Sequence, residues 1–195
     1  MQIKRIAEGG GIKEKYGPVI GLSHDVDITE KYNRITLKSK LQYLKDANRN
    51  DYWRFDDIME IEQSFGTKST FYFCTHNRYS AIGNPKDVAY DIKTKKFKDI
   101  IHKISNNGFS IGLHASINQY SFPESFIESQ ELLKKLLNHE VIGVRHHWWN
   151  VGNDKEQTFK HHFNAGFKYD TSLCSEEITG FMDGRMHPYY IGNTM

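Results

Sequence analysis

The chain has 195 residues, with 26 lysines and arginines against 24 aspartates and glutamates, which allows one domain with a sizeable core. The balanced charge gives no electrostatic case for a nucleic acid or an anionic membrane as partner, and no apolar stretch approaches the ~20 residues that span a bilayer. The start, Met1–Arg5, lacks the apolar segment of a signal peptide, and Cys74 and Cys174 fit small core residues of a reducing compartment. We therefore expect a cytoplasmic protein, and the sequence indicates no oligomeric state.

We expect residues 1–16, which are polar and glycine-rich, to form a flexible lead-in to one domain over residues 17–195. The domain opens with an apolar run from Val19 that ends in Asp25 and Asp27, a pattern typical of a buried strand. Because side chains alternate along a strand, both carboxylates point the same way, and their repulsion calls for a cation, a shared proton or water. A metal held by one carboxylate, with the other left as a base, is the simplest remedy. An N-cap followed by a turn explains the same two residues.

Strand-like and helix-like segments then alternate along the chain. Helical spacing of apolar residues begins at Leu37, Trp53 and Phe97 and recurs over 123–137 and 155–164, while strands are expected at 70–74, 109–114, 141–145 and 166–170. This alternation predicts an α/β fold with parallel strands, in which polar residues at the carboxyl ends of the strands meet on one rim. The residues at those ends are Asp25, Asp27, His76, His114, Arg145, His146, His147 and Asp170.

In their order, four motifs of the chain resemble the polysaccharide deacetylase superfamily, the metal-dependent carbohydrate esterases built on a deformed (β/α) barrel. Residues 22–27, 68–73, 108–114 and 166–170 carry the likeness, which is to the branch with an Asp-x-Asp first motif and covers roughly residues 17–192. The resemblance implies a deformed barrel. The superfamily's last motif, Leu-x-His, does not occur before Met195, and five strands are fewer than a closed barrel needs, so we expect a barrel that is incomplete at its C-terminus.

The resemblance also assigns roles to residues. It implies that Asp25 is the general base, that Asp27 and His114 are metal ligands, and that Arg145 orients the base. It further implies that Asp170 helps to hold the arginine or the base. A hydrogen bond to backbone explains His114 equally well, and Arg145 fits an ordinary surface arginine at a strand end.

Asn118 stands where many members of the superfamily have a second histidine, four residues after the first. We therefore expect weak binding of a divalent metal, zinc by its ligand types, completed by water with either Asn118 or His146. On the resemblance, the substrate is a saccharide, or a saccharide precursor, that loses an N-acetyl or O-acetyl group. Its candidate contacts are His76, His147, Trp148 and Trp149, for which core packing is the alternative. Another amide hydrolase on the same barrel, and a metal-free carbohydrate-binding protein, remain as rival functions.

Overall fold

The computed structural model describes residues 20–31, 37–48, 52–75, 87–88 and 90–174. The expected lead-in at residues 1–16 and the candidate contact His76 lie outside these described residues.

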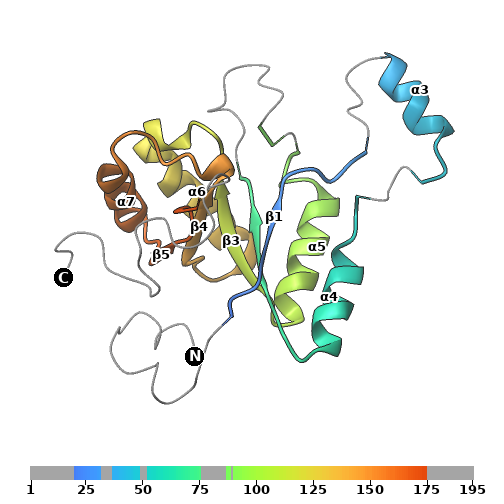
Figure 1. Cartoon of the computed structure of the whole chain (residues 1–195), viewed down its shortest axis with the longest axis horizontal. Coiled ribbons are helices and arrows are strands. Elements are labelled where there is room, and N and C mark those ends of the chain that lie inside the picture. Colours follow the sequence, from blue (N-terminus) through green and yellow to red (C-terminus); the bar gives the residue numbers. More distant parts are fainter. Residues whose placement is uncertain (1–19, 32–36, 49–51, 76–86, 89, 175–195) are drawn as a thin grey trace.

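Five parallel strands lie side by side in the order of the chain (Figure 1). They are β1 (Ser23–Val26), β2 (Thr70–Phe73), β3 (Ser110–Ala115), β4 (Gly143–His146) and β5 (Tyr169–Asp170). Each strand pairs in parallel with the next, which confirms the α/β fold expected from the alternating pattern. Among the described residues the sheet remains open, with β1 and β5 as its two edges.

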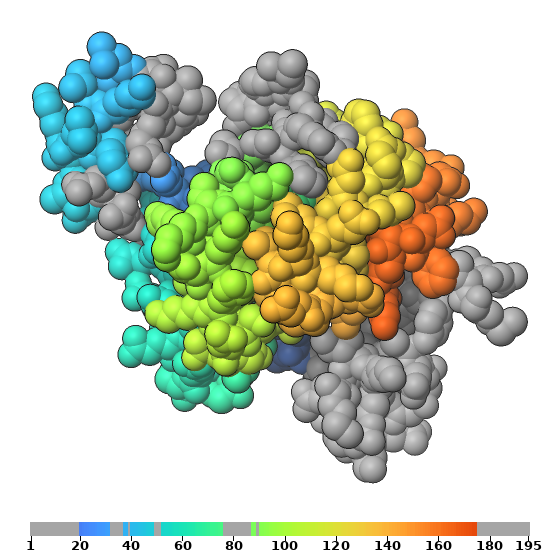
Figure 2. All heavy atoms as spheres, turned by 180° about the vertical axis from the view of Figure 1, so that it is seen from behind, coloured from blue at the N-terminus to red at the C-terminus, as the bar shows by residue number. Residues whose placement is uncertain are grey.

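The helices between the strands begin and end where local chemistry favours it. They are α3 (Leu37–Lys45), α4 (Phe55–Ser64), α5 (Lys95–Asn106), α6 (Pro123–Leu137) and α7 (Lys155–Asn164). Pro123 occupies the first turn of α6, where its missing N–H costs nothing, and Asn138 ends that helix in a left-handed conformation at φ 60°. From α4 to α7, each helix contacts the next, and they succeed one another in chain order across the face seen in Figure 2.

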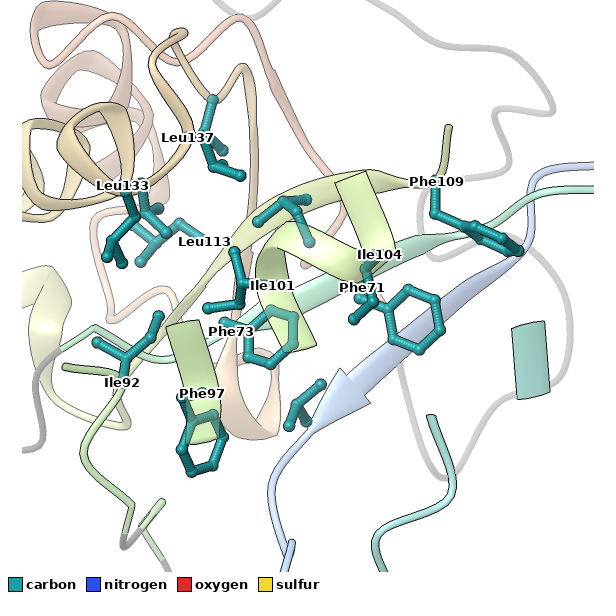
Figure 3. Packing of buried hydrophobic residues seen from close by; sticks show 14 of the residues in the cluster. Phe71, Phe73, Ile92, Phe97, Ile101, Ile104, Phe109, Leu113, Leu133 and Leu137 are labelled. Carbon is teal, nitrogen blue, oxygen red and sulfur yellow. The ribbon is translucent and has the colours of Figure 1, made fainter. Parts of the chain in front are cut away.

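The hydrophobic core lies between the sheet and this layer of helices (Figure 3). Phe71 and Phe73, on the same side of β2, are fully buried and meet Ile101 and Ile104 of α5 in the same cluster. Leu113 of β3 lies in that cluster as well, because the pairing sets it beside Phe73. The strands therefore give one face to the helices and keep the opposite face for polar side chains.

Two expectations from the sequence need correction. The first strand begins at Ser23 instead of Val19, and Ile20 is 83% exposed, because an edge strand needs no apolar residues on both faces. The leucines of α3, Leu37, Leu41 and Leu44, form a helix as expected but are exposed. None of the helices in the described part of the chain combines the length and apolar character needed to cross a membrane.

Candidate metal centre and carboxylate site

Strand register gathers the polar side chains on the face opposite the helices. In the sheet, Asp25 pairs with Tyr72, and Tyr72 pairs with Gly112, so all three residues share this face. His114, two residues after Gly112, pairs with Arg145 on the same face. Residues from the first four strands therefore meet above the carboxyl ends of the sheet.

Three potential metal ligands come together at this rim. The Oδ1 atom of Asp27 lies 2.9 Å from Nε2 of His114 and 3.4 Å from Nδ1 of His147, and the two histidine nitrogens are 3.1 Å apart. Both imidazoles are buried, whereas the Asp27 side chain is 38% exposed. All three ligand atoms lie within 4.8 Å of one another, a spacing that suits ligands around one ion.

The protonation of His114 shows why this cluster needs a cation. Its Nδ1 lies 3.1 Å from the backbone carbonyl of Arg145, and because a carbonyl can only accept, Nδ1 carries the hydrogen. In the neutral ring, Nε2 then presents a lone pair to the Asp27 carboxylate. Two acceptors at 2.9 Å repel unless a proton or a metal ion lies between them. A histidine whose second nitrogen is fixed by a carbonyl is a common arrangement in metal sites, so these residues fit a divalent metal.

The electrostatics of Asp27 agree with a cationic environment. Burial alone raises the pKa of this carboxyl, but His114 and His147, in their protonated forms, outweigh burial through hydrogen bonds and charge and hold the pKa well below its usual value. Asp27 is therefore ionised at neutral pH and is available as a ligand.

Beside this cluster, Arg145 holds Asp25 in place with a fork of three donors. Its Nη1 donates to Oδ1 of Asp25, its Nη2 to the hydroxyl of Ser23, and its Nε to the hydroxyl of Thr171, each at 2.9 Å. The guanidinium lies 4.6 Å from the centroid of the Tyr72 ring, and Thr171 donates in turn to the Tyr72 hydroxyl. Asp25 thus has one oxygen tied to a cation, while its side chain stays 28% exposed.

The third member of the metal cluster differs from the one expected. The structure groups His147 with Asp27 and His114, whereas the sequence suggested Asn118 or His146. His146 is the last residue of β4 and faces the helices, where its Nε2 lies 2.9 Å from Nε2 of His162. Asn118 instead precedes the short 3-10 turn Gln119–Ser121, and its backbone carbonyl accepts from Ser121. His147 lies two residues after Arg145 and on the arginine's face, because the alternation of β4 continues for one residue beyond the end of the strand.

Asp170 also lies elsewhere than expected. It pairs with Val144 and therefore faces the helices, so it does not share the face of Asp25. Its carboxylate accepts from the backbone N–H and the hydroxyl of Ser172 at 2.6 and 2.9 Å. The contact with the Arg145 guanidinium is made by the next residue, Thr171. Sequence reasoning missed Thr171, and it missed Ser23 although that residue lies two before Asp25 on the same strand.

The turn that presents His147 has unusual backbone geometry. Trp148 and Trp149 both adopt left-handed conformations, at φ 56° and 51°, which tryptophan rarely does. Asn150 donates from its amide to the carbonyl of Ile117 at 2.8 Å and so ties this turn to the loop after β3. Trp148 is 53% exposed, with its ring 5.8 Å from that of His147. Such conformations concentrate at functional sites, where the surrounding structure enforces them.

Three solved structures are partly similar to this chain. Streptococcus pyogenes deacetylase PplD in complex with acetate is 16% identical, and the match covers 59% of this chain and 48% of the PplD chain, with a TM-score of 0.42. A candidate polysaccharide deacetylase from Mycobacterium smegmatis is 16% identical, and the match covers 78% of this chain and 50% of the deacetylase, with a TM-score of 0.44. The Xyl-CE4 domain of a multidomain xylanase from the hindgut metagenome of Trinervitermes trinervoides is 14% identical, and the match covers 53% of this chain and 47% of that domain, with a TM-score of 0.38.

The chain thus spans about half the length of each of these three proteins. At TM-scores and identities this low, none of the three establishes the family or the activity of the chain. No family model matches the sequence, and no curated protein matches it.

Proposed function

We propose that the chain is a metal-dependent hydrolase that removes an acetyl group from the nitrogen, or an oxygen, of a saccharide. One observation carries the proposal: the Asp27, His114 and His147 cluster lies beside a second carboxylate, Asp25, which is held by an arginine. The motif likeness to carbohydrate esterases in the sequence points to the same chemistry.

Asp27, His114 and His147 would hold the metal, with zinc the natural choice for one carboxylate and two imidazoles. A bound divalent ion supplies a Lewis acid that polarises an acyl carbonyl and acidifies a water molecule. With three protein ligands, the set leaves room for water and substrate, as catalytic zinc sites do.

Asp25 is the general base of this proposal. Its Oδ1 accepts a hydrogen bond from Arg145, which orients the carboxylate. Ser23 and Thr171 fix the arginine from two further directions, so the position of the carboxylate is well defined. The exposed ring of Trp148, next to His147, offers an apolar face against which a sugar ring can pack.

The test measures acetate release from N-acetylated oligosaccharides together with metal content, in wild type, Asp25→Asn and Asp27→Asn. Asp25→Asn should lose turnover and keep all of its metal, whereas Asp27→Asn should lose turnover together with the metal held by the Asp27, His114 and His147 cluster. Asp99→Asn, at an exposed carboxylate paired with Lys95 on α5, is the matched control and should behave as wild type.

Each rival function predicts a different result. A chain that binds oligosaccharides but no metal, and releases no acetate, is a carbohydrate-binding protein. A metal-loaded chain that cleaves other linear or cyclic amides, and leaves acetylated sugars intact, is an amide hydrolase of another kind. Equal metal loss in Asp25→Asn and Asp27→Asn would contradict the division of roles between the two carboxylates.

A further inference from the structure

We propose that His146, His162 and Asp170 form a second, buried metal site, which takes a divalent cation of the zinc class. The three residues come from the end of β4, from α7 and from β5. They lie on the helix-facing side of the sheet, whereas the Asp27 cluster lies on the other side. The inference is independent of the proposed catalytic function.

The spacing of the ligand atoms matches a metal site. The Nε2 atoms of His146 and His162 are 2.9 Å apart, and Nδ1 of His162 lies 3.4 Å from Oδ2 of Asp170. One ligand atom from each residue can be chosen so that all three lie within 4.8 Å of one another. Ligands of a tetrahedral zinc ion lie ~2.0–2.1 Å from the metal and hence ~3.4 Å from one another, so only small side-chain shifts are needed to admit the ion.

Hydrogen bonding leaves lone pairs in this cluster without donors. Between two neutral imidazoles, one Nε2 must donate and the other must accept, so one ring retains a bare Nδ1 and the other a protonated one. Yet Nδ1 of His146 and Nδ1 of His162 both lack a hydrogen-bond partner, although both atoms are buried. Buried polar atoms in native proteins are nearly always satisfied. Among the two rings, the protein therefore leaves one buried lone pair without a donor and one buried N–H without an acceptor.

The charge distribution around the cluster also favours a cation. The Asp170 carboxylate accepts from the backbone N–H and the hydroxyl of Ser172, and both imidazoles are buried beside it. Within the described part of the chain, no lysine or arginine forms an ion pair with Asp170. A divalent ion would place a positive charge next to this carboxylate.

The surroundings indicate a structural ion. His146 is fully buried and His162 is 4% exposed. The ring of Phe126 lies 4.6 Å from that of His162 and 5.7 Å from that of His146, and Phe159 covers His162 from another side at 5.8 Å. No substrate reaches a cation enclosed in this way, so its function is to join β4, α7 and β5. Because His146 directly precedes His147, the ion also anchors the strand end that carries a ligand of the first cluster.

The experiment counts bound metal in the full chain. Wild type, Asp27→Ala, His162→Gln and the double variant are stripped with chelator, reloaded with zinc or cobalt(II), dialysed and analysed for metal per chain. Each single variant should bind one equivalent fewer than wild type, and the double variant should bind none. His161→Gln, at the partly exposed neighbouring position on α7, is the matched control and should bind as wild type does.

A spectroscopic variant tests ligation directly. His162→Cys should retain the site and give the charge-transfer absorption of a cobalt–thiolate bond, and His161→Cys should not. If the His162 variants fail to fold by circular dichroism, Asp27→Ala alone decides, because it should still bind one equivalent and melt at a higher temperature when zinc is added. The proposal is overturned if Asp27→Ala binds no metal, or if folded His162→Gln binds as much as wild type. Should the Asp27 cluster hold no metal, wild type and Asp27→Ala would bind alike, and only the proposed function would fail.

Discussion

Replacing Arg145 with lysine separates the charge of this residue from its forked geometry. The wild-type guanidinium donates to three acceptors, on Asp25, Ser23 and Thr171, while packing over the ring of Tyr72. A lysine ammonium can keep the positive charge next to Asp25, but it is a single point donor that cannot reach all three acceptors from one position. Arg145→Lys should therefore lose two hydrogen bonds and keep one.

The expected cost follows from these contacts. Hydrogen bonds to charged groups contribute about 1.5–3 kcal/mol each, and the partial exposure of this site favours the lower end of that range. The arginine side chain is 17% exposed, so water replaces the lost partners only in part. We expect Arg145→Lys to lower the free energy of unfolding by about 2–3 kcal/mol. In a chain of this size that corresponds to a melting temperature roughly 4–12 °C lower.

The assay is urea unfolding in the presence of chelator, so that metal binding does not contribute. Arg54→Lys is the control, since Arg54 pairs with Asp57 on α4 and both side chains are more than half exposed. That substitution should change stability by less than about 0.5 kcal/mol. If Arg145→Lys changes stability no more than the control does, the fork is not what holds this site together. With metal bound, acetate release by Arg145→Lys should also fall, by up to the ~10²–10⁴-fold that a positioned base contributes.

Three further outcomes are expected. Gly112→Ala should lower the free energy of unfolding in urea by about 1–3 kcal/mol, because the added Cβ would lie 2.4 Å from the Tyr72 ring. Gly21→Ala is the control and should have no such cost, since no atom lies within 4 Å of its added Cβ. Equal effects of the two substitutions would contradict the close packing at Gly112. Chelation should remove about 2.7 kcal/mol of stability relative to protein with metal at a hundred times its Kd, and the melting temperature should fall accordingly. An unchanged melting temperature would mean that no metal binds. In chelator, the free energy of unfolding should fall as the pH drops from about 6.5 towards about 3, because His146 and His162 have lowered pKa values and bind protons more readily once unfolded. Asp170, whose pKa is raised, acts in the opposite direction between 3.8 and about 7, but it is one group against two. Urea titrations at pH 4.5 and 6.5 measure this, and His162→Gln should flatten the difference.

The central strands could be predicted from the sequence because they are buried on both faces. The run from Thr70 to Phe73 consists of β-preferring residues, and the structure has a strand over those residues. The first strand was harder to place, because an edge strand needs only a short paired segment. Ile20, which suggested a buried strand on hydrophobicity alone, is exposed instead.

The candidate site could be predicted only as far as strand ends allow. The Asp-x-Asp spacing set Asp25 and Asp27 on one face, and parallel topology brought His114 and Arg145 to them. The third member of the metal cluster depends on where β4 stops alternating, and a shift of one residue exchanges His146 for His147. That position is decided by the turn beyond the strand, including two tryptophans in conformations that no local propensity favours.

The sequential order of the sheet has a consequence for synthesis on the ribosome. Because every strand pairs with its predecessor, each strand–helix unit can dock as soon as it emerges, without waiting for a distant partner. The first metal cluster, however, draws Asp27 from the start of the sheet, His114 from the middle and His147 from beyond the fourth strand. A nascent chain has most of its sheet before it has its third ligand. Metal uptake is therefore a late event, which can lock the first strands together but cannot guide their assembly.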